Sequence, residues 1–405
     1  MKRLFRIGTS IFSKSIFPVL TWILLSVTIA PEISNVFSLT YPIQFISLTL
    51  FYLFGSGANI KAKREKNDAA IQSGMFVGTF VFLLITTLLI VNINGYLSFF
   101  NVDVSFYRVL TIYAIFFEFL RYVLSIILEK LYFEAKEKIA YIISFLFNFT
   151  NFLIVVIVSL LTKNQIAIAL SSLIPSTIFI FALFCSQLKK FKLDLNFLSN
   201  FKYESSGIVC CIVIFLTYFF SYGNAFQFGP EIILVITFTN LITDSQWDSF
   251  EAVSTTVKID TSSGNYNHKT STKNQIIYSM VVALSSILFF LIFFDIYKIN
   301  LKIGLIFLFF NIVDMMLSPI YYGFDSFIQL EYSPTKNIIN HLLGYAIRFS
   351  IGTFMRNEYC IIIAQIVSSL FMCIFSLYIR FAKYKIDKNG KLIRTDKKIT
   401  VWKIF

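Results

Sequence analysis

Acidic and amide side chains at helical spacing mark the segment Thr239 to Asp260, the most polar run in an otherwise apolar sequence. Asn240, Asp244, Asp248 and Glu251 recur at steps of three and four residues, so they share one face of a helix. A long apolar lead-in precedes them, and a membrane-spanning helix needs about 20 residues. We therefore expect the stripe to run from mid-depth to the membrane surface, where acids favour a functional role. Alternatively, Asp248 and Glu251 lie beyond the hydrocarbon and only solvate the helix end.

A second charged pair interrupts the apolar segment 105–133. Glu118 and Arg121 stand three residues apart, so they lie one turn apart on the same side of a helix and can form an ion pair. A single charge at the bilayer centre costs about 2.5–3.5 kcal/mol on insertion scales. We therefore expect this pair to face protein or water, either in a transport pathway or as a salt bridge that only fixes helix packing.

The segment 303–330 also has a polar stripe, with Asn311 and Asp314 on one face of the predicted helix. A carboxylate removed from water can hold a proton near neutral pH, because burial disfavours its charged form. Asp314 is thus our candidate carrier of a coupling charge. In the alternative interpretation it is permanently paired with Arg348, which lies near mid-depth in the segment 337–356.

The composition indicates a polytopic membrane protein. Hydrophobic residues make up 57% of the chain, charged residues 14%, and the mean hydropathy is +0.75, whereas soluble domains carry about 25% charged residues. A net charge of +13 could suggest nucleic acid, but Lys and Arg gather in short runs between apolar segments. That pattern reports membrane topology, so we expect a bilayer and no nucleic-acid partner.

Chemistry by a metal or a cofactor is not indicated. The five cysteines lie within apolar segments without CxxC or CxxH spacing, and the two histidines are far apart in the sequence. We also find no nucleotide-binding loop and no nucleophile elbow. We therefore predict no metal site, no cofactor and no enzyme activity.

Twelve apolar segments are long enough to cross a bilayer, and basic runs fall in alternate connections between them. This bias predicts a multi-pass protein of the plasma membrane with both termini in the cytoplasm. The predicted helices cover residues 7–30, 36–60, 69–93, 105–133, 139–161, 165–187, 207–226, 230–258, 276–299, 303–330, 337–356 and 359–382.

A basic segment divides these helices six and six. We predict an N-terminal lobe over 1–187, a cytoplasmic basic linker over 188–206, a C-terminal lobe over 207–382 and a basic cytoplasmic tail over 383–405. A short similarity between the residues from Leu131 and those from Leu330 supports two parallel repeats, which would place a pathway at the lobe interface.

The pattern resembles the MATE (multidrug and toxic compound extrusion) transporters and the superfamily that they share with lipid-linked oligosaccharide flippases. The resemblance is carried by twelve helices in two lobes, by Gly55-Ser56-Gly57 running into the loop Lys61 to Asn67, and by Gln72-Ser73-Gly74. It implies an all-α fold, alternating access and exchange of Na⁺ or H⁺ for an organic substrate. Asp314 matches an acid of that family, whereas 7–30 and 207–226 lack the carboxylates often found there.

Two transport functions and one other class remain. The first is a cation-coupled efflux antiporter, working as a monomer, for small amphipathic and cationic compounds bound among aromatic rings and carboxylates. The alternative is a flippase for lipid-linked saccharides, in which Arg121, Arg348 and Lys14 would meet a pyrophosphate. The third is a membrane scaffold or a transferase acting on lipid-linked substrates. The sign of the cavity charge discriminates the first two.

Overall fold

The chain is almost entirely helical. The computed structural model describes residues 2–100, 102–187, 194, 196–228, 230–297, 299–331, 334–388 and 390–394. Before residue 188 the elements are α1 (Lys2–Thr28), η1 (Pro31–Ser34), α2 (Asn35–Leu50), the π-helix η2 (Phe51–Ser56), α3 (Gly57–Glu65), α4 (Ala69–Val91), α5 (Ile93–Phe99), α6 (Val104–Phe133), α7 (Glu137–Thr162) and α8 (Gln165–Gln187). After it come η3 (Phe197–Asn200), α9 (Phe201–Ala225), η4 (Phe226–Phe228), α10 (Pro230–Ser249), α11 (Glu251–Ser262), α12 (His268–Tyr297), α13 (Leu301–Glu331), α14 (Pro334–Phe354), α15 (Cys360–Lys383), β1 (Tyr384–Ile386) and β2 (Leu392–Arg394).

The helices follow the apolar segments of the sequence closely. Ten helical segments of the described residues are long and apolar enough to cross a membrane. Two of the expected twelve segments are not among these ten. They are the α10–α11 rod, which carries Asp248 and Glu251, and α14, which carries Arg348. Charged side chains at these positions need protein or water as neighbours, and so we expect the faces that carry them to point into the bundle.

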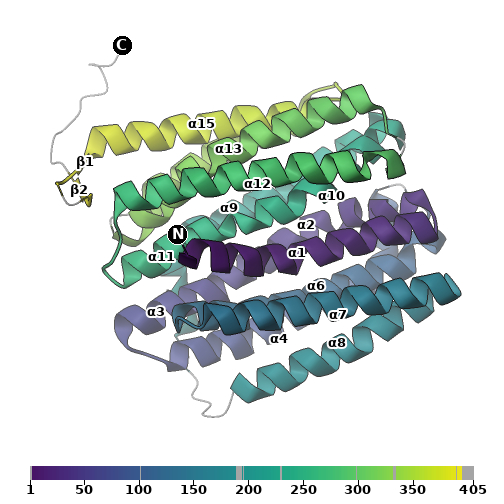
Figure 1. The fold of residues 1–405 in the computed structure, drawn as a ribbon, viewed down its shortest axis with the longest axis horizontal. Coiled ribbons are helices and arrows are strands. Elements are labelled where there is room, and N and C mark those ends of the chain that lie inside the picture. Colours follow the sequence, from purple (N-terminus) through teal and green to yellow (C-terminus); the bar gives the residue numbers. More distant parts are fainter. Residues whose placement is uncertain are drawn as a thin grey trace.

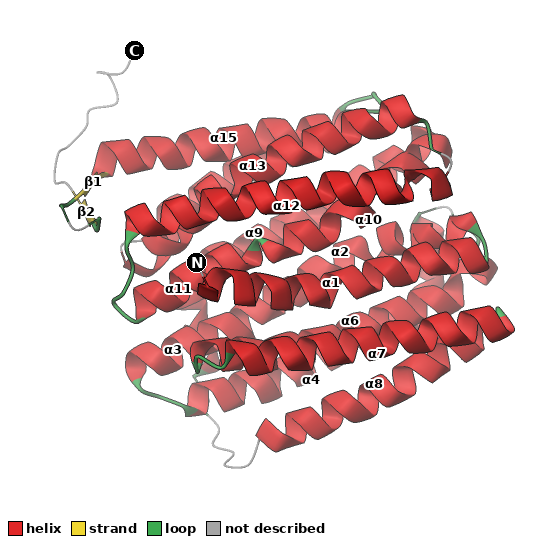
Figure 2. Ribbon diagram, viewed as in Figure 1, coloured by secondary structure: helices red, strands yellow, loops and turns green. Residues whose placement is uncertain are grey.

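The rods run side by side in a single bundle (Figure 1), joined by short loops at its two ends (Figure 2). In this view α4, α6, α7 and α8 lie in the lower part, α12, α13 and α15 in the upper part, and α1, α2, α9 and α10 between them. Contacts agree, because α1 packs on α7, α10 and α11, and α2 packs on α6 and α9. The four middle helices therefore join the early and the late parts of the chain.

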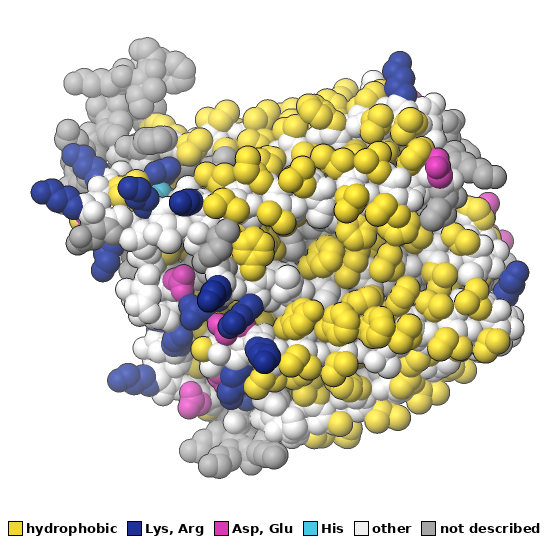
Figure 3. Space-filling model, viewed as in Figure 1, with side chains coloured by type: hydrophobic (Ala, Val, Ile, Leu, Met, Phe, Trp, Pro, Cys, Tyr) yellow, Lys and Arg dark blue, Asp and Glu magenta, His cyan; other side chains and the backbone are white. Residues whose placement is uncertain are grey.

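The surface is that of a membrane protein. Large apolar side chains are exposed along α4, α7, α8 and α12, for example Leu161 at 77% and Leu284 at 66%. Figure 3 shows hydrophobic side chains over the sides of the bundle, with Lys and Arg gathered at the end that carries the N-terminus and the β1–β2 hairpin. This segregation is what a bilayer around the bundle requires.

Helix ends and close contacts follow local sequence signals. Asp103 caps α6 by accepting a hydrogen bond from the Ser105 N–H at 2.9 Å. Where α4 crosses η2, a Cβ added to Gly74 would lie 2.2 Å from the backbone oxygen of Phe54. Only glycine permits this approach, so η2 and α4 are held in direct backbone contact.

Candidate functional site

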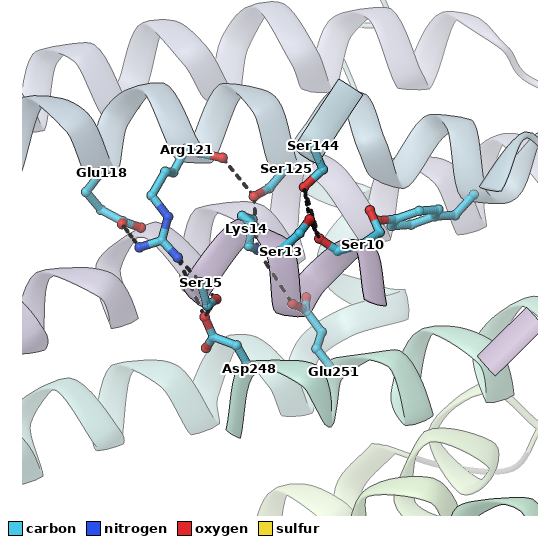
Figure 4. Close-up of polar contacts among 11 residues, drawn as sticks. Ser10, Ser13, Lys14, Ser15, Glu118, Arg121, Ser125, Ser144, Asp248 and Glu251 are labelled. Carbon is cyan, nitrogen blue, oxygen red and sulfur yellow. Dashed lines mark hydrogen bonds and ion pairs between the residues drawn. The ribbon is translucent and has the colours of Figure 1, made fainter. Parts of the chain in front are cut away.

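A charged cluster joins α1 and α6 to α10 (Figure 4). Arg121 Nη1 lies 3.0 Å from Glu118 Oε2, and its Nη2 lies 3.6 Å from Asp248 Oδ2. Ser15 of α1 donates its hydroxyl to the same Asp248 oxygen. The expected pairing of Glu118 with Arg121 is therefore present, and the guanidinium also reaches a carboxylate that lies 127 residues later in the sequence (248 − 121).

A second charged contact lies beside the first, one turn farther along α6. Lys14 Nζ of α1 donates to Ser125 Oγ at 3.3 Å and lies 4.0 Å from Glu251 Oε2 at the start of α11. The side chains of Lys14 and Glu251 are 11% and 15% exposed. Asp248 and Glu251 thus face basic side chains of the early helices, while their depth in the membrane stays a prediction.

The cluster has more negative than positive groups. With all side chains ionised, three carboxylates, Glu118, Asp248 and Glu251, face two cations, Lys14 and Arg121. The sum is −1 (2 − 3). In partly dry surroundings such an excess attracts a further cation more strongly than it would in water.

The cluster forms one wall of a central cavity. Asp248 and Glu251 line this cavity together with Gln44 of α2, Asn240 of α10 and Arg348 of α14. The remaining polar and aromatic lining comes from Tyr41, Phe45, Tyr52, Tyr218, Thr243, Phe250, Ser254, Asn311, Tyr322, Tyr345 and Gln365. An aromatic cavity with two carboxylates and one guanidinium can bind an amphipathic organic cation through ring and charge contacts.

Asp314 lies behind the cavity wall. Its side chain is fully buried, and its Oδ2 lies 3.8 Å from Arg348 Nη2. Arg348 is held further by Ser368 Oγ at 2.9 Å and by the face of the Tyr345 ring at 5.3 Å. The structure therefore has the Asp314–Arg348 pair that the sequence allowed, with the guanidinium standing between the acid and the cavity.

Known structures share this fold. The chain is similar to an outward-facing structure of a multidrug resistance MATE family transporter of the MOP superfamily, with 13% identity and a TM-score of 0.67, over 94% of this chain and 95% of that one. The chain has the MATE fold. An inward-facing structure of such a transporter matches with 13% identity, 91% and 95% coverage and a TM-score of 0.66. A MOP superfamily transporter from Pyrococcus furiosus, described as having reversed polarity of its binding pocket, matches with 13% identity, 93% and 95% coverage and a TM-score of 0.69. Neither a protein-family model nor a curated protein matches the sequence.

The MATE fold confirms the all-α architecture that the sequence predicted. It also brings together most of the candidate residues. Asn240 and Asn311 line the central cavity with Asp248 and Arg348, while Glu118 and Arg121 stand behind Asp248. The side chain of Asp244 lies outside the described residues.

Sequence reasoning missed two buried charged pairs of this MATE-like chain. Lys258 Nζ of α11 donates to Glu204 Oε1 of α9 at 2.6 Å, and His341 Nε2 of α14 lies 3.1 Å from Asp325 Oδ2 of α13. Each pair joins residues of different helices, so helical spacing alone gives no signal for it. The only available clue was that each charged residue occurs within or beside an apolar segment.

The division at residues 188–206 stays a prediction. Asp194 and the residues from 196 belong to the described part of this segment, and there α9 already begins at Phe201. Of the tail from 383, the structure describes a short hairpin in which β1 pairs antiparallel with β2. The residues from 395 onward lie outside the described part.

Proposed function

We propose that this protein is a secondary transporter that exchanges Na⁺ or H⁺ for an amphipathic organic cation by alternating access. The observation that carries the proposal is the aromatic central cavity, whose wall contains Asp248 and Glu251. A cation placed there would meet rings and carboxylates at once. The MATE fold, seen in both inward-facing and outward-facing transporters, supports the alternating-access part of the proposal.

Ion pairs across the middle of the bundle suit such a cycle. Arg121 and Lys14, from α6 and α1, approach Asp248 and Glu251, from α10 and α11. An organic cation or coupling ion that binds Asp248 or Glu251 would weaken the ion pair of that carboxylate with Arg121 or Lys14. Binding would then favour the conformation with fewer cross-bundle pairs, since a ligand shifts an equilibrium by its differential affinity.

A lipid-linked saccharide flippase is the alternative. It would need basic groups free to bind a pyrophosphate. The three candidates, Arg121, Lys14 and Arg348, each lie within 4.0 Å of a carboxylate. The neutralised cations and the two acids on the cavity wall support the antiporter over the flippase.

The proposal includes the protein's setting. Lys and Arg gather at the bundle end with the N-terminus and the hairpin, so the positive-inside rule assigns that end to the cytoplasm. We place the protein in the plasma membrane, acting as a monomer.

The test is transport in reconstituted liposomes. Wild type and Asp248→Asn would be compared for ethidium movement under an imposed H⁺ gradient and, separately, a Na⁺ gradient. The proposal expects gradient-driven movement in wild type and its loss in Asp248→Asn at equal protein incorporation. If wild type moves ethidium under neither gradient, the antiporter proposal fails, and lipid-linked saccharides become the substrate to test.

A further inference from the structure

His341 and Asp325 form a buried acid–base pair between α13 and α14. His341 Nε2 lies 3.1 Å from Asp325 Oδ2, and each side chain is 6% exposed. Ser376 of α15 donates its hydroxyl to the other oxygen, Asp325 Oδ1, at 3.0 Å. The carboxylate is therefore held between an imidazole and a hydroxyl from two different helices.

One side of this pair faces the central cavity through aromatic rings. The imidazole stacks on Tyr345, with ring centroids 6.2 Å apart and planes 16° apart, and lies 6.4 Å from the Tyr322 ring. Both tyrosines line the central cavity. A ligand in contact with these rings is thus separated from the imidazole by one layer of side chains.

The other side approaches a second cavity. Ser376 lines this space of about 220 Å³ together with Phe324, His268, Tyr266 and Arg380. The cavity lies where α12 begins and α15 ends, beside the β1–β2 hairpin, because the His268 N–H donates to the Gly390 carbonyl at 2.9 Å and Tyr384 packs on Phe324. This volume can hold several waters, each needing about 30 Å³. Water in this cavity would be separated from Asp325 by one hydroxyl, on the side of the bundle where the β1–β2 hairpin lies.

The two bases of the pair can share one proton. With a neutral imidazole, Asp325 would be a buried anion beside a neutral ring; one added proton converts the pair into imidazolium and carboxylate, which attract each other. Thiols and phenols, which are ordinarily neutral at pH 7, surround the pair. Among the described residues they are Cys210 of α9, Tyr321 and Tyr322 of α13, Tyr345 of α14 and Cys373 of α15. Cations lie farther out: Arg348 over the Tyr345 ring, and Arg380 in the second cavity, which His268 also lines.

We propose that His341 and Asp325 hold the proton that this transporter exchanges for substrate, with access through Ser376 from the second cavity. The inference rests on the proposed antiport and names H⁺ as its coupling ion. A cation on the Tyr322 and Tyr345 rings repels the imidazolium behind them. The proton then leaves His341 for Asp325, and Asp325 passes it through the Ser376 hydroxyl to water in the second cavity, so that one charge enters as one leaves.

The experiment compares two assays in liposomes with ethidium as the probe. One is uptake driven by a proton gradient; the other is counterflow, the exchange of labelled for unlabelled ethidium without any ion gradient. The variants are His341→Gln and Asp325→Asn. The matched control is Asp295→Asn, which makes the same change at an exposed residue near the end of α12.

We expect His341→Gln and Asp325→Asn to lose proton-driven uptake by at least about tenfold while counterflow persists. Wild-type counterflow should change toward alkaline pH, where the imidazolium paired with Asp325 loses its proton, and that change should vanish in His341→Gln. Retained counterflow shows that a variant is folded and binds ethidium. A merely structural pair would change both assays together and leave the pH profile in place.

Three results overturn the inference. Proton-driven uptake that survives in His341→Gln removes the imidazole from the coupling. Loss of counterflow together with uptake in both variants assigns the pair to structure. Wild-type uptake driven by Na⁺ alone excludes this proton site but agrees with the antiporter proposal. If wild type moves ethidium under neither gradient, the antiporter proposal itself is refuted.

Discussion

Lys258 of α11 donates to Glu204 of α9 at 2.6 Å, and their side chains are 5% and 0% exposed. The Ser56 hydroxyl of η2 donates to the same Glu204 oxygen at 2.5 Å, and the ammonium lies 4.8 Å from the centre of the Tyr52 ring. Glu204 has non-helical backbone angles, so α9 changes direction at this residue. One buried carboxylate thus ties together three segments that are distant in the sequence.

Replacing Lys258 by Met should strongly destabilise the protein. The change leaves the Glu204 carboxylate buried without its cation, and breaking a buried pair in this way costs about 3–5 kcal/mol. Thermal unfolding of the purified protein in detergent measures the effect. The double variant Lys258→Met with Glu204→Gln should recover part of the loss, since no buried anion remains. If the single and double variants unfold at the same temperature, the pair does not carry the stability assigned to it.

Gly74→Ala should also destabilise the fold, for a steric reason. The new Cβ would lie 2.2 Å from the Phe54 backbone oxygen and 2.9 Å from the Ala58 Cβ. Overpacking of this kind typically costs about 1–3 kcal/mol. Gly95→Ala is the matched control, because a Cβ there meets nothing within 4 Å and α5 gains a better helix former. Equal melting temperatures of Gly74→Ala and wild type would refute the close approach of η2 and α4.

The sequence predicted the helices well because hydrophobic runs and basic loops are local signals. The predicted segment 105–133 and α6 (Val104–Phe133) differ by one residue at the start. Local signals failed where pairing is decided between distant helices. Asp325 and His341 stand 16 residues apart (341 − 325), and nothing in either helix specifies that they meet.

The candidate site was predicted as a set of stripes, not as a shared cavity. Asn240 and Asp248 lie on one stripe, Asn311 on another, and the structure places all three around the central cavity. The pairing of Arg121 with Asp248 was not foreseen, because the sequence offered Glu118 as a nearer partner. The role of each acidic residue depends on which side chains lie next to it in the folded protein, and the sequence does not give those neighbours.

The link between Lys61 and Asp194 should make stability depend on pH in the acid range. Lys61 Nζ donates to Asp194 Oδ2 at 2.7 Å, and this hydrogen bond holds the pKa of the Asp194 carboxyl below its usual range. A group whose pKa is depressed on folding stabilises the protein above its unfolded pKa, and the contribution is lost as the pH falls through the folded pKa. Asp194→Asn should therefore lower the melting temperature at neutral pH.

The same variant and wild type should converge in melting temperature as the pH falls from about 5 to about 2. Lys61→Met is the control, because without the ammonium the folded pKa of Asp194 lies closer to the unfolded pKa and the acid-range loss of stability should be smaller. A constant difference between wild type and Asp194→Asn over this range would contradict the assigned role of the ion pair.

The direction in which Arg121→Gln changes ethidium affinity separates the antiporter hypothesis from the flippase hypothesis. Arg121 holds Asp248 at 3.6 Å and Glu118 at 3.0 Å, so it competes with any cation that enters the cavity. Its removal should leave the cavity wall more negative and tighten ethidium binding by about tenfold, which corresponds to about 1.4 kcal/mol. Fluorescence titration of the purified protein in detergent measures the change.

An anionic pyrophosphate lipid should bind Arg121→Gln more weakly than wild type, because it loses a basic partner. Arg356→Gln, the same substitution at an exposed loop residue, should alter neither affinity. Weaker ethidium binding by Arg121→Gln would contradict the cation site and favour the flippase.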